Sequence, residues 1–428
     1  MTTGVLVLLV LFAAALAIDL PVAFALALAS VGYLVLFDAA PVIVVAQRML
    51  GGLDSFPLLA IPLFLLAGNL MTGAGLTRRI VNLCVALVGN VRGGLAAAAV
   101  LGCALFSALS GSSIADVVAI GSILVPAMTR QGYPRSFSAA LLGSAGTLGQ
   151  VIPPSIVMVV YGTLTNTSIG QLFLAGFVPG LVLAGALVIT AVFLARRHGW
   201  GSAGDPASAT RLGEAFRQSL LALVVPVLIV GGIRAGLATP TEAAGLAVFY
   251  ALFIGVFVER SLTPAAIWAA LRDATEGTVA ILLVIATASL FGWILAAERM
   301  PQAITAAIIA LTEDRNVVLL LLTVVLLVLG TFMEALATVI ILAPVLMPLL
   351  LHYGIDPVHF GLLMIVNISI GGATPPLGVN LMAACRIAGV LQAETYRWLL
   401  PMLGALIAAL LVMTYWEDLV MFLPRWTG

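Results

Sequence analysis

The sequence predicts an all-α polytopic membrane protein of two inverted repeats, each with a re-entrant helical hairpin and a broken transmembrane helix. Three observations predict it: the composition, a repeated pattern of Gly and Pro, and the sign of the loop charges. Of 428 residues, 63% are hydrophobic and 8% are charged, whereas soluble chains have about 45–50% and about 25%. This composition excludes a soluble enzyme, a disordered chain and a nucleic-acid partner. A chain of this length could form about ten membrane spans of about 20 residues each.

Apolar stretches occur in the same order in both halves of the chain. Those of the first half are 4–18, 21–37, 58–71, 93–109, 117–128, 137–165 and 172–195. Those of the second are 219–234, 241–258, 279–297, 316–332, 337–351, 360–385 and 398–422. The polar segment 196–218 between them is predicted to be a linker. Two short segments, 41–50 and 263–272, carry Arg48, Trp268 and Arg272 and are predicted to be interfacial amphipathic arms.

An internal repeat supports this division. At one offset, Gly and Pro recur as the pairs Pro126 and Pro348, Gly132 and Gly354, Gly149 and Gly371, and Pro153-Pro154 and Pro375-Pro376. Gly and Pro dictate backbone shape, so a match of Gly and Pro positions between the two halves is less subject to chance than a match of apolar residues. The predicted repeats are 1–195 and 219–428, joined by a cytoplasmic linker, 196–218.

Loop charges predict that the repeats have opposite orientations. Loops of the first repeat carry arginines without acids, at Arg78, Arg79, Arg92, Arg130 and Arg135. The matching second-repeat segments carry Glu298, Arg299, Glu313, Asp314, Arg315, His352, Asp356 and His359. Arginine-rich loops favour the cytoplasm. We therefore expect the first set inside and the second outside.

Two segments are predicted to be re-entrant hairpins. The segment 93–130 lies between two Arg-bearing segments on the same side, and Ser110-Gly111-Ser112-Ser113 lies near its middle. The repeat places a second hairpin at 316–351, turning near Gly330 to Leu336. The alternative is two ordinary spans per hairpin, which would leave serines and Asp116 in lipid at high cost.

The long span after each hairpin is predicted to be broken, at 137–165 and 360–386. The interruptions are Gly146 to Pro154 and Ser369 to Pro376, and each contains a Pro-Pro pair. Proline removes an N–H group and glycine weakens a helix. Backbone freed in this way persists in mid-membrane only where it lines a cavity or binds something. Paired broken helices in inverted repeats indicate a transport site.

The freed carbonyls and nearby hydroxyls are hard oxygen ligands that suit Na⁺. One cation is expected among Ser107, Ser110, Gly149 and Ile152, and a second among Gly330, Gly371, Thr374 and Leu377. The alternative is that the glycines and serines only allow close helix packing. No organic cofactor is expected.

An anionic substrate is expected between the two hairpin tips, where half-helix N-termini direct positive charge. The candidate contacts are Ser112, Ser113, Asp116, Glu334, Thr374 and Asn380. Asp116 and Glu334 could instead hydrogen-bond their own tips, bind a cation, carry a proton or be packing acids.

Motifs of enzymes are absent from the sequence. It contains no P-loop Gly-Lys-Ser, no His-Glu-x-x-His and no Gly-x-Ser-x-Gly. All three histidines fall in predicted loops away from the serines, which argues against a Ser/His hydrolase. The three cysteines, Cys84, Cys103 and Cys385, are predicted to be buried apolar residues.

Several motifs together resemble the large membrane subunit (DctM-like) of TRAP transporters, the tripartite ATP-independent periplasmic type. They are Phe56 to Phe64, Ser110 to Asp116, Gln150 to Ser155, Thr239 to Ala243 and Ala373 to Gly378. The likeness covers nearly the whole chain. It implies Na⁺-driven uptake of an organic acid across a bacterial inner membrane. It also implies an elevator motion, in which hairpins and broken helices move against a scaffold.

The resemblance further implies two partners. One is a periplasmic substrate-binding protein (DctP-like), and the other is a small four-helix membrane subunit (DctQ-like), expected to be a separate chain. Two other functions remain open from the sequence: a self-sufficient ion-coupled carboxylate transporter or antiporter, and an intramembrane enzyme with Asp116 and Glu334 as an acid pair. The substrate is not identified.

Overall fold

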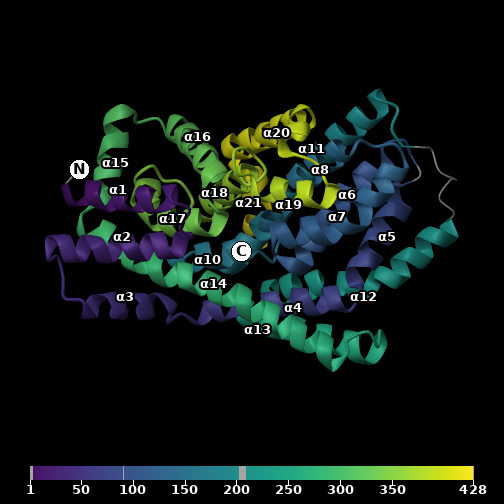
Figure 1. Cartoon of the computed structure of the whole chain (residues 1–428), viewed down its shortest axis with the longest axis horizontal. Helices are drawn as coiled ribbons and strands as arrows, with labels where there is room; N and C mark the ends of the chain where they lie inside the picture. The colour runs from purple at the N-terminus through teal and green to yellow at the C-terminus, as the bar shows by residue number, and fades with distance from the viewer. Residues whose placement is uncertain (1–2, 90, 202–208, 428) are drawn as a thin grey trace.

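The computed structural model describes residues 3–89, 91–201 and 209–427. All regular structure in these residues is helical (Figure 1). Nine of their helices are long and apolar enough to cross a membrane. The count is ten if the pair Arg135–Val151 and Ile156–Thr165, bent by 42°, forms one span. The expected all-α polytopic class is therefore confirmed.

The helices of the first half begin with a set that we call the first frame helices: α1 (Thr3–Ala17), α2 (Val22–Phe37), α3 (Ile43–Leu53), the 3₁₀ turn η1 (Phe56–Leu59), α4 (Ala60–Gly73) and α5 (Leu76–Val88). The first inner helices follow: α6 (Gly94–Ser110), α7 (Ser113–Arg130), α8 (Arg135–Ala145), α9 (Leu148–Val151), α10 (Ile156–Thr165) and α11 (Ile169–Arg197).

The second half has a similar order. Its frame helices are α12 (Ala209–Arg234), α13 (Pro240–Phe253) with the π-helical turn η2 (Ile254–Val258), α14 (Pro264–Ala297) and α15 (Met300–Leu311). Its inner helices are α16 (Arg315–Phe332), α17 (Ala335–His352), α18 (Pro357–Gly371), α19 (Val379–Ala388), α20 (Gln392–Tyr415) and α21 (Glu417–Thr427).

The frame helices of both halves pack on one another. Helix α14 runs beside α2, α3 and α4, and α13 packs on α4 while α12 packs on α5 (Figure 1). The inner helices form the other group, in which α8 packs against α19 and α20, and α16 packs against α18. The two groups meet mainly where α5 lies along α6 and where α14 and α15 lie along α17.

The predicted arm at 263–272 differs from the structure. That segment is the first part of α14, which continues without interruption from Pro264 to Ala297. Thr263 caps its N-terminus by accepting a hydrogen bond from the Ala266 amide at 3.2 Å. Apart from Pro264 in the first turn, the helix contains no proline, so the drop in hydropathy at its start does not end the helix. The other predicted arm, 41–50, lies on α3, a separate short helix.

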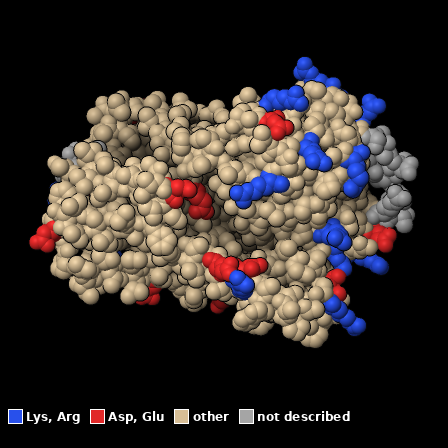
Figure 2. Space-filling model, in the orientation of Figure 1, with Lys and Arg blue, Asp and Glu red and all other residues tan. Residues whose placement is uncertain are grey.

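Arginine side chains gather toward one end of the molecule. Figure 2 shows the basic groups concentrated in the right-hand part of this face, while acidic groups are scattered over it. That part of the view contains α5, the end of α11 and the start of α12 (Figure 1). The basic side chains of this face therefore gather near the end of α11 and the start of α12.

Candidate functional site

The tip of the first helical pair is a two-residue turn, Gly111 and Ser112, between α6 and α7. Gly111 has a φ of 61°, a conformation that favours glycine. A Cβ atom at Gly111 would also lie 2.9 Å from the carbonyl oxygen of Pro154, in the first broken helix. Glycine is thus needed at this position both for the turn and for the close approach of the break.

Asp116 lies one turn into α7 and is fully buried. Its carboxylate accepts a hydrogen bond from the Ser107 hydroxyl at 2.6 Å and another from the Ser110 hydroxyl. Of the roles open to this acid, the structure shows it bonded to its own tip. Among the described residues Asp116 is the only buried carboxylate, and the buried hydroxyl of Ser113 beside it has no hydrogen-bond partner.

The first broken helix packs directly under this tip. A Cβ atom at Gly149, in the short helix α9, would lie 2.5 Å from Asp116 Oδ2 and 2.7 Å from Ser113 Cα. After Ile152, Pro153 and Pro154 interrupt the helix, and Ser155 caps α10 by accepting from the Met158 amide at 3.4 Å. The structure therefore brings together Ser107, Ser110, Ser113, Asp116 and Gly149, all predicted site residues. Ile152, also predicted there, is buried against Gly180 of α11.

The second pair of helices has its turn at Met333 and Glu334, between α16 and α17. Near this turn, Gly330 packs against the second broken helix through backbone atoms. A Cβ atom at Gly371 would lie 2.5 Å from Gly330 Cα, and one at Gly330 would lie 3.0 Å from Ile368 Cα. Two predicted members of the second cation site, Gly330 and Gly371, are thus in contact.

The other predicted residues of the second half are less closely grouped. The Thr374 hydroxyl donates to the Ile370 carbonyl at 2.8 Å, within the turn that follows α18. Leu377 and Glu334 are exposed, and no described hydrogen bond joins either side chain to this contact. The two prolines at 375–376 follow Thr374, and their peptide bond is cis, as is that of Pro153-Pro154.

Asn380 lies in α19, in the second broken helix, and packs against the first. It is 4% exposed, and its backbone N–H donates to the Gly372 carbonyl at 3.0 Å. A Cβ atom at Gly146 would lie 3.3 Å from its Cγ. Asn380 therefore touches both interruptions, whereas Ser112 lies at the first tip only.

A contact that the sequence analysis missed also joins the two breaks. The Ser369 hydroxyl in α18 donates to the Gln150 side-chain oxygen at 2.6 Å. The sequence gives one indication of this contact, because Gln150 is a polar residue inside the Gly146–Pro154 interruption. No sequence feature identified its partner.

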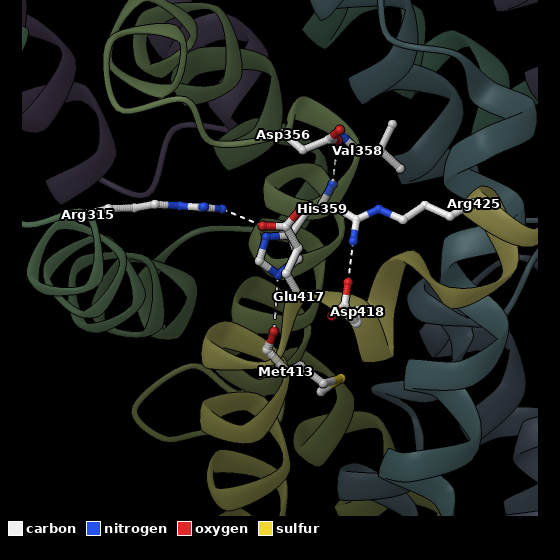
Figure 3. A network of polar contacts seen from close by, with 8 residues as sticks. All are labelled: Arg315, Asp356, Val358, His359, Met413, Glu417, Asp418 and Arg425. Atoms are coloured by element: carbon white, nitrogen blue, oxygen red, sulfur yellow. Dashed lines mark hydrogen bonds and ion pairs between the residues drawn. The ribbon is translucent and has the colours of Figure 1, made fainter. Parts of the chain in front are cut away.

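A polar network holds the far end of the second broken helix (Figure 3). Glu417 of α21 accepts from Arg315 of α16 at 2.5 Å and from Arg425 at 2.5 Å, and Arg425 also pairs with Asp418. Beside it, His359 of α18 contacts the Met413 carbonyl through Nε2 at 3.1 Å. The network ties α16, α18, α20 and α21 together at the end remote from the break.

These oxygen donors fit a hard monovalent cation. Hydroxyls, a buried carboxylate and interrupted backbone surround Gly149, and an unpartnered Ser113 hydroxyl lies beside them. Among the described residues, no three His, Cys, Asp or Glu side chains form a cluster that could hold a metal ion. The donor set thus suits Na⁺ better than a transition metal.

In this multi-pass chain, broken helices pack against helical tips, and this arrangement places the chain in the class of membrane transporters. The chain belongs to the DctM family: residues 9–419 match the family model for the "tripartite ATP-independent periplasmic transporter, DctM component". It is a TRAP large permease subunit and not an enzyme, so the resemblance seen in the sequence is confirmed.

The names of three relatives mention different substrates. The chain is 42% identical to the C4-dicarboxylate permease DctM of Pseudomonas aeruginosa, over 92% of each protein. It is 37% identical to the sialic acid permease SiaM of Vibrio cholerae, over 95% of each. It is 41% identical to the isethionate permease DctMQ of Oleidesulfovibrio alaskensis, covering 96% of this chain but 65% of that protein.

Two solved structures share the fold at low identity. The YdaH transporter of Alcanivorax borkumensis has a TM-score of 0.55 at 19% identity, covering 87% of this chain and 88% of that one. MtrF of Neisseria gonorrhoeae has a TM-score of 0.57 at 15% identity, covering 88% and 85%. These similarities concern the fold alone.

Proposed function

We propose that this chain imports a small organic acid across the bacterial inner membrane, coupled to Na⁺, by an elevator motion. It would work with a small four-helix membrane subunit and a periplasmic binding protein. The names of three relatives, which concern C4-dicarboxylate, sialic acid and isethionate, support an organic anion as the substrate.

One observation carries this proposal: the glycine of each broken helix packs against a helical tip of its own half. Gly149 lies under Ser113 and Asp116, and Gly371 lies against Gly330. In each place, oxygen-bearing groups and interrupted backbone meet inside an apolar chain. This arrangement is typical of transport sites.

Two Na⁺ ions would be held at these contacts. Ser107, Ser110, Gly149 and Ile152 would provide the first site, with Asp116 holding the serine hydroxyls in place. Gly330, Gly371, Thr374 and Leu377 would provide the second. When bound, the cations supply positive charge beside an anionic substrate. Ser112, Ser113, Glu334 and Asn380 would face that substrate between the tips.

In the proposed elevator motion, the inner helices move against the frame helices. Helices α5 and α6, and α14 and α17, then form the surfaces that slide. Under the inverted-repeat topology, the hairpins α6–α7 and α16–α17 enter from opposite sides, the first from the cytoplasm.

The first experiment is to melt the purified chain in NaCl, KCl and choline chloride at equal ionic strength. A ligand present at 100 times its Kd stabilises a protein by about 2.7 kcal/mol, so selective stabilisation by NaCl is the expected result. Equal melting temperatures in the three salts, both for the chain alone and with the small subunit added, would refute built-in Na⁺ sites.

A variant at the second site sharpens this test. Thr374→Ala removes a proposed ligand, so we expect the NaCl-specific shift to decrease. Thr305→Ala is the matched control, because Thr305 donates to the carbonyl four residues earlier at 2.8 Å, as Thr374 does, but lies in the frame helix α15. An equal NaCl response in both variants would remove Thr374 from the site.

A further inference from the structure

A cavity of about 770 Å³ lies between frame and inner helices, away from the tips. Its frame wall includes Ser55, Pro57 and Arg234, and its inner wall includes Thr163, Asn166 and Gln171. The volume is within the range of ligand pockets, about 300–1,000 Å³. Because both groups of helices line it, a relative motion of the two groups would change its shape.

Arg234 is the only charged residue among those lining this cavity. Its guanidinium lies over the Trp426 ring, 5.5 Å from the ring centroid, and no described carboxylate pairs with it. The polar lining otherwise consists of hydroxyl and amide side chains. Such a surface favours anions, because a cleft with charge of one sign concentrates the opposite ion.

The cavity and the basic linker lie at opposite ends of α11 and α12. Helix α11 has 29 residues and runs from the cavity wall at Ile169 to Arg197, the second residue of the predicted linker 196–218. Helix α12 has 26 residues and runs from Ala209, inside the predicted linker, back to Arg234. A helix of this length crosses a bilayer. If the arginine-rich linker is cytoplasmic, the cavity opens on the outer side.

This cavity is separate from the site at the tips. It contacts the C-terminal end of α10, from Gly162 onward, whereas the break lies before Ile156. At 1.5 Å per residue, that interval of helix is about 10 Å long. None of the predicted cation or substrate residues lines the cavity.

We infer that this cavity is an outer receiving site for a small organic anion, a carboxylate or a sulfonate, with Arg234 as its charged contact. The inference rests on the proposed function, since it is the delivered substrate that would stop here before reaching the tips. The polar wall formed by Asn166 and Gln171 would hydrogen-bond the anion, and Arg234 would balance its charge.

The test measures thiol labelling rather than transport. Cys84, Cys103 and Cys385 are buried, so a cysteine placed at the exposed Gln171 can be labelled selectively. In intact cells, the reaction rate of Gln171→Cys is compared for two membrane-impermeant methanethiosulfonates, one with an anionic sulfonate and one with a cationic trimethylammonium group. The comparison is repeated with Arg234→Glu and Arg234→Lys.

The expected result is a preference for the anionic reagent that falls by about tenfold with Arg234→Glu and returns with Arg234→Lys. Succinate or isethionate should slow the labelling, whereas neutral succinamide should not. At Gln302→Cys, an exposed control position in α15, Arg234 substitutions should change nothing.

Equal rates for both reagents, or no protection by either anion, would overturn the receiving site. Labelling only after the cells are permeabilised would overturn its outer location. The NaCl-specific melting of the wild-type chain is measured in parallel. A positive melt with negative labelling therefore refutes the cavity assignment alone, and the reverse result refutes the Na⁺ sites alone.

Discussion

At the scale of single residues, the first tip depends on Gly149 having no side chain. The adjacent groups are the Ser113 backbone and the Asp116 carboxylate, and both belong to the buried first turn of α7. A methyl group there would push the tip away from the broken helix. The hydrogen bonds from Ser107 and Ser110 to Asp116 would then be disturbed as well.

We therefore expect Gly149→Ala to abolish most uptake in proteoliposomes and to lower the melting temperature. Overpacking in a tight core costs about 1–3 kcal/mol. Gly185→Ala in α11 is the matched control, since a Cβ atom at Gly185 meets nothing within 4 Å. Uptake by Gly149→Ala at the level of this control would show that the close contact is unimportant.

The residue types in the sequence are enough to indicate several members of the site. Gly, Ser and Pro inside an apolar span are costly, so Ser107, Ser110 and Gly149 could be singled out. The bond between Ser369 and Gln150 could not be predicted, because the two residues are 219 positions apart. Their contact depends on how the two broken helices cross, which no local pattern encodes.

At the scale of elements, caps were predictable and helix lengths were less so. The sequence Thr239-Pro240-Thr241-Glu242 is typical of a capping box, and Thr239 and Glu242 form one at the start of α13, because each side chain bonds the backbone of the other. In contrast, the segment 263–272, predicted as a separate arm, runs into α14, which continues through the polar residues Arg272, Asp273 and Glu276. Polar residues do not end a helix when good helix formers surround them.

The C-terminal helix α21 is held by Glu417, whose side chain is 23% exposed. Partial burial raises the pKa of this carboxyl, but the hydrogen bond from Arg315 and the charges of His359 and Arg425 outweigh it, so the net pKa is lowered. A carboxyl with a lowered folded-state pKa stabilises the fold above its ordinary pKa. That contribution is lost as the pH falls through the folded-state pKa.

Glu417→Gln should accordingly reduce the free energy of unfolding by about 1–2 kcal/mol at pH 7. The difference from wild type should shrink as the pH falls below the ordinary value of 4.5. Glu276→Gln is a suitable control, because the Arg272–Glu276 pair is well exposed and such pairs contribute little. A pH-independent difference for Glu417→Gln would indicate lost packing rather than lost charge.

At the scale of the whole molecule, the arginines give the clearest indication of orientation. They gather toward one end of the face seen in Figure 2, near the helices that flank the linker. The composition and the helical class could be predicted from the sequence, because the bilayer admits few folds. The packing of frame on inner helices could not, since hydropathy does not say which apolar faces meet.

A labelling experiment in intact cells checks the orientation. We expect Glu313→Cys, exposed between α15 and α16, to react with a membrane-impermeant maleimide. Glu214→Cys, exposed in the first part of α12, should react only after permeabilisation. The reverse pattern would invert the proposed topology, and labelling of both sites from outside would contradict a cytoplasmic linker.

The contact between Gly330 and Gly371 has a consequence for how this chain tolerates mutation. Most tight contacts can be restored by enlarging one partner and trimming the other. Here both partners already lack a side chain, and the atoms in contact belong to the backbone. No second-site change within the pair can compensate for a first. In a saturation library selected for uptake, each position should accept glycine alone, and double variants should show no mutual rescue.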